Sequence, residues 1–479
     1  MTLHKNYIDG QWVGSTNTIQ NINPSNINDC VGEYASASLK DMNNAFAAAT
    51  CAFSTWSRSN IQFRSDALDS IGNEILSRKD ELGDLLAREE GKVLVEATGE
   101  VMRAGHIFKF FSGEALRLTG ETVPSVRPGV DTEIRREPVG VIGIITPWNF
   151  PIAIPSWKIA PALAYGNTVV FKPASLVTGS AWALAEIISR SGIPAGVFNM
   201  VAGSGDIAGN AILQDPRVSA VSFTGSVSTG SRVAAECSAR GAKYQLEMGG
   251  KNPQIVLDDA SIDLAVNCSI NSSFLSTGQR CTASSRIIVT EGIYDQFVDK
   301  IVIATKALKV GNARDPSTQI GPVADHSQLK QDLKYITIGN AEGASLACGG
   351  ERLSLKDDGF YLSPALFIDT SNTMQINRDE IFGPIAAVMK VSGYDEAVAV
   401  ANDTPFGLSA GICTKSLKYS SQFKRDSKAG MVMINLPTAG VDYHVPFGGT
   451  KGSSYGSREQ GSYAKEFYTT VKTIYTFPD

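Results

Sequence analysis

The chain has 479 residues, 43% of them apolar, a length that predicts two or three domains and a composition that can fill their cores. Its formal net charge is −5, and no block of Lys and Arg interrupts the mixture of signs, which argues against nucleic acid or an anionic membrane as a partner. The opening has no apolar leader and no later run approaches the roughly 18 apolar residues of a membrane span, so we expect a cytoplasmic protein.

The cysteines and histidines do not indicate a metal site or a disulfide framework. The seven cysteines include no CxxC pair, and none of the four histidines belongs to an HExxH motif. This usage fits a reducing compartment. We therefore expect no bound metal.

Residues 1–120 are predicted to be rich in helix. Ala, Leu and Met recur at helical spacing in LKDMNNAFAAATCAFSTW, and again from Ile61 to Phe111. Segment 121–137 then breaks this pattern with prolines and alternating residues, and the tail EFYTTVKTIYT alternates in the same way. We expect exposed strands in both segments.

From Val139 onward the sequence predicts a parallel, doubly wound α/β sheet. The runs VGVIGIIT, NTVVF, VFNMV and VSAVSF are short and continuously apolar, as strands buried on both faces are. The segments between them carry helical spacing and glycine stops. A second α/β portion follows LEMGGKNPQIVL and runs to about residue 458.

Ligands of an open parallel sheet bind beyond the carboxyl ends of its strands, so the residues after these runs are candidate site residues. Asn149, in PWNFP, has a constrained backbone and an amide that can donate to an oxyanion, although this segment alone favours a simple turn residue. Lys172 and Ser175, in TVVFKPAS, suit the ribose or phosphate of a nucleotide, or a plain surface turn.

Two further strand ends carry glycines. Gly225 and Ser226 stand at an expected helix start, which favours a pyrophosphate, but their spacing is not GxGxxG and the motif is weak. Glu247 precedes two glycines that permit a close approach to the backbone.

Cys281 is the candidate nucleophile. It lies among small and polar residues in STGQRCTASS, whereas Cys268 and Cys413 lie in runs typical of core packing. The nearest downstream histidine, His326, lies in a polar helical stretch and makes a poor partner. A carboxylate would have to serve as the base.

Five ordered motifs, PWNFP, LEMGGKNP, GQRC, DEIFGP and PFGGTKGSSYGSREQG, resemble those of the NAD(P)-dependent aldehyde dehydrogenase superfamily over essentially the whole chain. The resemblance implies that Cys281 adds to an aldehyde carbonyl, that Asn149 and the Cys281 N–H hold the oxyanion, and that Glu247 activates the water that hydrolyses the thioester. Lys158 takes the place of a proposed proton relay; a structural ion pair is the alternative.

The resemblance also implies a set of cofactor-binding residues. They are Ile145, Thr146, Trp148, Lys172, Ser175, Gly225, Ser226, Glu380 and Phe382. Glu380 would accept from the nicotinamide ribose, and Phe382 would pack beside the ring unless it is a core residue. Many NAD-preferring relatives have Glu in place of Ser175, so we expect NADP⁺ to be used, alone or alongside NAD⁺.

The implied fold has three parts. Residues 1–120 and 138–248 would form a Rossmann-like cofactor-binding domain, residues 249–458 an α/β catalytic domain, and residues 121–137 and 459–479 a small β element for oligomerisation. Because the exposed strands need a partner, a homodimer or homotetramer is expected.

Arg280 precedes the thiol, and two interpretations are open. It either points outward into an ion pair, since neighbouring side chains rarely face the same way, or lines the substrate tunnel and binds a substrate carboxylate. GQRCTASSR and PFGGTKGSSYGSREQG resemble bacterial α-ketoglutaric semialdehyde (2,5-dioxopentanoate) dehydrogenases, which implies a carboxylated semialdehyde as substrate. Succinate or glutarate semialdehyde, or a broad range of aldehydes, are alternative substrates.

Three alternative functions remain to be weighed: an inactive binding protein on this fold, a CoA-acylating enzyme, and a cysteine hydrolase without redox chemistry. Cys281, Glu247 and Asn149 together argue against the first, and Glu247 as a water-activating base argues against the second. The third lacks the histidine that it would need.

Overall fold

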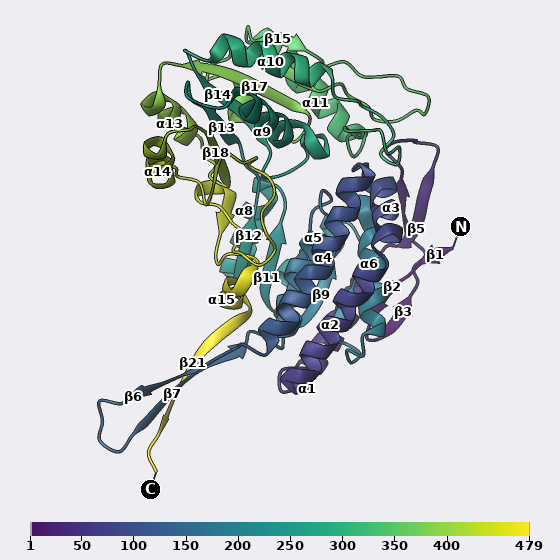
Figure 1. Cartoon of the computed structure of the whole chain (residues 1–479). Coiled ribbons are helices and arrows are strands. Elements are labelled where there is room, and N and C mark those ends of the chain that lie inside the picture. The colour runs from purple at the N-terminus through teal and green to yellow at the C-terminus, as the bar shows by residue number, and fades with distance from the viewer. Residues whose placement is uncertain (1, 479) are drawn as a thin grey trace.

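The computed structural model describes residues 2–478, which form four β-sheets surrounded by helices (Figure 1). The largest sheet has eight strands in the order β20-β12-β11-β8-β9-β10-β2-β3. Its centre is parallel and consists of β10 (Phe198–Met200), β9 (Thr168–Lys172), β8 (Val141–Ile145), β11 (Val218–Thr224) and β12 (Lys243–Glu247). These are the apolar runs from which the parallel sheet was predicted, together with the strand that ends at Glu247.

Both faces of this sheet are covered by helices, as a doubly wound fold requires. On β8, Ile142 and Ile144 belong to one hydrophobic core and Val141 to another, because successive side chains of a strand face opposite sides. The helices of this region are α1 (Leu39–Trp56), α2 (Ile61–Ser77), α3 (Lys79–Glu90), α4 (Leu94–Ala115), α5 (Ala153–Ala164), α6 (Thr178–Arg190), α7 (Asn210–Gln214) and α8 (Val227–Ala239).

The chain leaves the first sheet at Glu247 and enters a second, seven-stranded sheet at Asn252. Its order is β15-β16-β17-β14-β13-β18-β19, with β15 antiparallel to the rest. The strands are β13 (Asn252–Val256), β14 (Ser284–Thr290), β15 (Ser345–Cys348), β16 (Ala365–Ile368), β17 (Ile385–Val391), β18 (Ser409–Cys413) and β19 (Met431–Ile434). The accompanying helices are α9 (Ile262–Phe274), α10 (Tyr294–Lys306), α11 (His326–Ala341), α12 (Gln375–Arg378), α13 (Tyr394–Asn402) and α14 (Leu417–Asp426).

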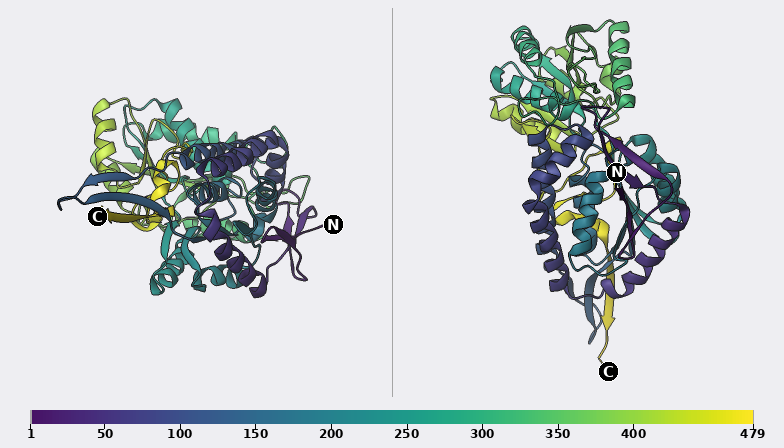
Figure 2. Two further views of the ribbon diagram at one scale, coloured as in Figure 1. Left: turned by 90° about the horizontal axis from the view of Figure 1, so that it is seen from below. Right: turned by 90° about the vertical axis from the view of Figure 1, so that its right-hand side faces the viewer.

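A three-stranded sheet of β6 (Glu121–Pro124), β7 (Asp131–Pro138) and β21 (Thr469–Thr476) projects from the body, with the C-terminus near its tip (Figures 1 and 2). Both segments expected to hold exposed strands therefore contain them. The last strand begins at Thr469 rather than at 459, because the short helix α15 (Lys465–Tyr468) precedes it. Its role in oligomerisation, like the division into domains, remains a prediction.

The first 35 residues differ from the helix-rich expectation, because they form short strands. A small sheet contains β1 (Leu3–His4), β4 (Thr18–Ile22) and β5 (Cys30–Ala35), while β2 (Asn6–Ile8) and β3 (Gln11–Val13) form a hairpin at the edge of the large sheet. Asp9 and Gly10, with φ of 50° and 73°, make its two-residue turn. Asp-Gly is a strong signal for a two-residue hairpin turn. The prediction of helix for residues 1–120 relied on the periodicity of the residues that follow this turn.

Among residues 2–478, no helix is long and apolar enough to cross a membrane.

The edge of the large sheet that lies opposite the β2–β3 hairpin is β20 (Ser454–Tyr455). This strand pairs antiparallel with β12 and places Ser454 beside Glu247. This pairing connects the end of the chain to the centre of the candidate site.

Candidate active site

Two cavities meet at Cys281. A cleft of about 470 Å³ lies at the carboxyl ends of β8 and β11, and a cavity of about 270 Å³ lies between α4, α5 and the loops around Cys281; Cys281 lines both. In an open α/β sheet, the strand ends are where a ligand is expected. A group bound in either cavity would therefore face the same thiol.

The backbone before the thiol has an uncommon conformation. Ser276 and Thr277 have φ of 51° and 56°, in the left-handed region, and Gly278 follows with 67°. Ser276 N donates to Glu96 Oε2 at 3.1 Å, and Thr277 Oγ1 donates to the Gly321 carbonyl at 3.2 Å. The strain of this turn is thus held by surrounding contacts, as is common at functional sites.

The surroundings of the Cys281 thiol favour its protonated form. Burial raises its pKa to about 12, with additional increases from the charges of Glu380 and Glu247, while the N–H groups of Thr282 and Cys281 lower it. Its carbonyl accepts from Asn252 Nδ2 at 2.8 Å, which fixes the peptide. Formation of the thiolate therefore requires positive charge or a base that arrives with a ligand.

Asn149 follows β8, lines the cleft and is buried. Its Nδ2 donates to the Gln279 carbonyl at 3.0 Å, two residues before the thiol, and its own carbonyl accepts from Lys92 Nζ at 2.6 Å. The structure thus places the Asn149 amide next to the Cys281 loop, where an oxyanion donor is needed.

Glu247 is buried at the end of β12 and accepts from Ser454 Oγ at 2.6 Å. Burial raises its pKa well above the ordinary value, and the charge of Glu459 raises it further. Glu247 lines neither cavity, but its charge is close enough to raise the pKa of Cys281. A carboxyl group of this kind is suited to act as a base near neutral pH.

Lys158 forms a buried ion pair with Glu459 and donates to Ser222 Oγ at 2.9 Å. The sequence analysis did not identify Glu459, which lies 301 positions further along the chain. Because Lys158 lowers and Glu459 raises the pKa of Glu247, the pair is electrically connected to the candidate base. The geometry accommodates both interpretations of Lys158, structural ion pair and relay.

Most of the predicted cofactor residues line the cleft: Ile145, Thr146, Trp148, Gly225, Ser226, Glu380 and Phe382. Ser226 caps α8, accepting from Thr229 N at 3.3 Å, so the N-terminus of a thirteen-residue helix borders the cleft. Such a terminus attracts phosphate. Phe382 meets Trp148 edge-on with 5.4 Å between ring centroids, and so lies at the cleft rather than in a core cluster.

Glu380 and Gly249 show why the cleft suits a ribose. Glu380 accepts from Gly250 N at 2.9 Å, and burial raises its pKa to about 7. A Cβ at Gly249 would run into the Glu380 carboxyl group, so only glycine leaves this acceptor free. Glu380 could therefore accept a hydrogen bond from a hydroxyl group of a ligand bound in this cleft.

Lys172 and Ser175 lie outside the measured cleft, at the end of β9 beside β8. Lys172 Nζ donates to the Pro173 carbonyl at 2.7 Å, and burial lowers its pKa to about 8. Ser175 Oγ donates to the Gly203 carbonyl at 3.2 Å. The two residues thus lie at the end of the strand next to β8 and do not line the cleft, and their role in cofactor binding remains a prediction.

Arg280 does not make the outward ion pair that one interpretation expected. It lines the 270 Å³ cavity, its Nη2 donates to the Asn271 carbonyl, and within residues 2–478 it has no carboxylate partner. A second guanidinium, Arg103 of α4, also lines this cavity. No sequence signal identified Arg103, because it is a single polar residue on a helix whose orientation depends on tertiary packing.

Comparison with known proteins identifies the family. Residues 12–474 match the sequence model of the aldehyde dehydrogenase family. The chain is 42% identical over 477 residues to alpha-ketoglutaric semialdehyde dehydrogenase of Bacillus subtilis, covering 99% of this chain and 98% of the relative. The chain belongs to the aldehyde dehydrogenase family. The predicted family and fold are therefore confirmed.

Solved aldehyde dehydrogenase structures have the same fold. The betaine aldehyde dehydrogenase of Staphylococcus aureus, in complex with NAD⁺, superposes with a TM-score of 0.97 at 33% identity, covering 99% of this chain and 95% of that one. An NADP-dependent enzyme of Escherichia coli gives 0.96 at 34% identity, covering 99% and 98%. This aldehyde dehydrogenase is thus an NAD(P)-dependent enzyme of aldehyde oxidation, and its cleft fits that cofactor.

Proposed function

We propose that Cys281 is the nucleophile, and its position at the junction of the two cavities is the observation that carries this assignment. The thiolate adds to the aldehyde carbon presented from the smaller cavity. The Asn149 amide exchanges its bond to the Gln279 carbonyl for one to the developing oxyanion, and the Cys281 N–H donates as well. When bound, NAD(P)⁺ supplies the hydride acceptor, and an acyl thioester remains on Cys281.

Glu247 is the proposed base for hydrolysis of the thioester. Its raised pKa makes it able to take a proton from water near neutral pH, and Ser454 holds the carboxyl group in place. The charges of Lys158 and Glu459, which form an ion pair, lower and raise the pKa of Glu247 respectively. Lys158 is accordingly a positioning residue in this proposal.

The substrate proposed is a carboxylated semialdehyde, α-ketoglutaric semialdehyde in the first place. The substrate cavity is lined by three cationic side chains and two carboxylates, so one positive charge is in excess, which favours an anion. The name of the Bacillus subtilis relative supports the same substrate.

An NADPH-forming absorbance assay across matched aldehydes tests the substrate. We expect kcat/KM to be highest for 2,5-dioxopentanoate, intermediate for succinate and glutarate semialdehydes, and lowest for butanal and pentanal, with Cys281→Ala as the blank. Highest activity on the succinate or glutarate compound would identify that semialdehyde instead. Equal values for charged and neutral aldehydes would favour a broad-specificity enzyme.

NADP⁺ is the proposed cofactor, used alone or alongside NAD⁺. Ser175 leaves room for a 2′-phosphate, and Lys172 at the same strand end offers a cation to it. Steady-state comparison of the two cofactors is the test. A preference for NAD⁺ of about a hundredfold or more in kcat/KM would refute the assignment.

A homodimer or homotetramer is the proposed assembly. Val471, Tyr475 and Phe477 are exposed on and beside β21 in the single chain, and Val123 is exposed on β6. Light scattering after size-exclusion chromatography is expected to show a multiple of the 51.0 kDa chain. A monomer at micromolar concentration would contradict this assignment.

A further inference from the structure

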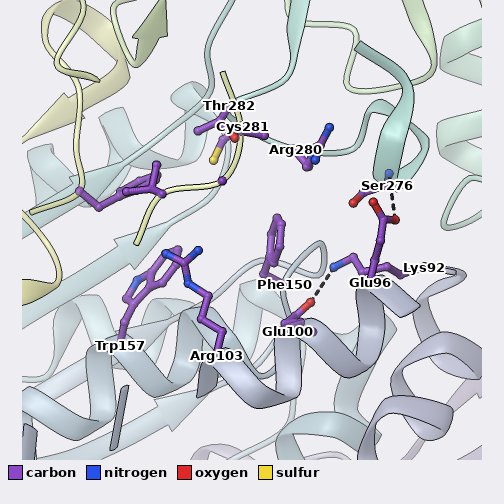
Figure 3. A pocket seen from close by; sticks show the side chains of 15 residues that line it. Lys92, Glu96, Glu100, Arg103, Phe150, Trp157, Ser276, Arg280, Cys281 and Thr282 are labelled. Carbon is purple, nitrogen blue, oxygen red and sulfur yellow. Dashed lines mark hydrogen bonds and ion pairs between the residues drawn. The ribbon is translucent and has the colours of Figure 1, made fainter. Parts of the chain in front are cut away.

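The charges that line the substrate cavity are unequally satisfied. The charged residues are Lys92, Glu96, Glu100, Arg103 and Arg280. Lys92 pairs with Glu100 at 2.6 Å, and Glu96 accepts from Ser276 N at 3.1 Å, as the dashed lines of Figure 3 mark. Glu100 is therefore neutralised by Lys92, whereas Glu96 forms no ion pair in the described chain. Burial lowers the pKa of Arg280, and the charge of Glu96 offsets this in part. Neither arginine forms an ion pair among residues 2–478.

Arg103 is held in a fixed orientation. Its Nη2 donates to Gln460 Oε1 at 3.0 Å, and its guanidinium carbon lies 5.7 Å from the centroid of the Trp157 ring, which itself stacks on Phe447. Its Nε is buried and has no partner in the described chain. Such a guanidinium needs little reorganisation to bind a ligand, and its remaining donors suit a carboxylate.

Arg280 is arranged differently. Its Nε, like that of Arg103, is buried and has no partner in the described chain, but its Nη2 donates to the Asn271 carbonyl and its side chain also borders a third cavity, of about 20 Å³. Figure 3 shows Arg280 and the Cys281 sulfur extending to different sides of the peptide that joins them, whereas Arg103 rises from α4 beside Trp157. A substrate bound at the sulfur therefore extends more readily toward Arg103.

We propose that Arg103 is the specificity-determining residue of the cavity and binds the distal carboxylate of the aldehyde substrate. The inference rests on the carboxylated substrate proposed above. Burial lowers the pKa of Arg103, and the charges of Glu100 and Asp442 offset this only in part, without forming an ion pair with it. A substrate carboxylate would give this guanidinium a direct counter-ion. A neutral aldehyde of equal length leaves the charge uncompensated, so the site discriminates against it.

The experiment compares Arg103→Met, Arg280→Met and Arg425→Met on succinate semialdehyde and on butanal, which have the same number of carbons. Arg425 lies exposed on α14 and is the matched surface control. For Arg103→Met, kcat/KM should fall roughly 10- to 100-fold more for succinate semialdehyde than for butanal, mainly through KM. Arg280→Met should alter this ratio less, and Arg425→Met should not alter it.

Arg103→Lys and a binding measurement keep the test decisive if the methionine variant folds poorly. The lysine variant should retain part of the preference, since charge remains but the bidentate geometry is lost. In a thermal-shift assay without cofactor, glutarate should stabilise the wild-type enzyme and not Arg103→Met.

The outcomes separate this inference from the proposed function. Equal losses on both aldehydes in Arg103→Met, or a selective loss in Arg280→Met alone, would overturn the role of Arg103 and leave the substrate class intact. A wild-type enzyme that does not prefer succinate semialdehyde to butanal would overturn both the proposed substrate class and the proposed role of Arg103.

Discussion

The two cavities that meet at Cys281 are built from different parts of the fold. The cofactor cleft consists of strand ends, the start of α8 and the loop of Glu380, so its character comes from the backbone of a parallel sheet. The substrate cavity lies between the faces of α4 and α5 and two loops, so its character comes from individual side chains. The side chains of the substrate cavity can therefore change, and the substrate with them, without a change in the cofactor cleft or in Cys281.

The two cavities also differ in charge. Glu380 is the acid that the cleft presents, whereas the substrate cavity has two arginines without carboxylate partners in the described chain. A cofactor with a cationic ring and a substrate with a carboxylate fit these two sides respectively. Mutations can test each side separately.

The largest effect is expected where the cavities meet. Cys281→Ala should lower kcat by roughly 10⁴-fold or more, because the nucleophile is lost, while calorimetry should still detect binding of NADP⁺ in the cleft. Cys51→Ala, at an exposed cysteine, is the matched control. Appreciable turnover in Cys281→Ala would show that the reaction does not pass through this thiol.

A smaller effect is expected at the far end of the cleft. Ser175→Glu places a carboxylate where the 2′-phosphate would lie, so the kcat/KM ratio should move toward NAD⁺ by roughly tenfold or more. Ser54→Glu adds the same charge at an exposed position of α1 and should leave the ratio unchanged. An unchanged ratio in Ser175→Glu would mean that the adenosine does not reach this strand end.

The smallest effects concern the pKa of Glu247. Ser454→Ala removes a hydrogen bond that lowers this pKa, and Glu459→Gln removes a charge that raises it. Because Glu247 must be ionised to act as a base, the acid limb of the kcat–pH profile should move up in the first variant and down in the second, each by about one unit. Shifts in the same direction would contradict the role of Glu247 as the titrating base.

The cofactor side was largely predictable from the sequence. Buried parallel strands appear as short apolar runs, and candidate residues such as Asn149 and Glu247 lie at one edge of the sheet because β8, β11 and β12 are parallel neighbours. Cys281 was recognisable from its polar surroundings. The full set of cofactor residues required the family motifs, since Gly225–Ser226 is not a standard phosphate loop.

The substrate side was not predictable in the same way. Arg103 lines the cavity because α4 packs against α5, a tertiary contact that the helical periodicity does not specify. Glu459 pairs with Lys158 across 301 positions, and neither residue carries a local signal of the other. The sequence identified Arg280 as a candidate substrate residue but did not predict the direction of its side chain, because that direction depends on the turn at Ser276 and Thr277.

Trapping the acyl-enzyme tests the central claim most directly, namely that one thiol between two cavities reacts and a separate carboxylate completes the turnover. Glu247→Gln, mixed with NADP⁺ and succinate semialdehyde, should give a burst of NADPH stoichiometric with active sites and a succinyl mass increase on the Cys281 peptide. Absence of the burst, or an adduct on another residue, would contradict the account.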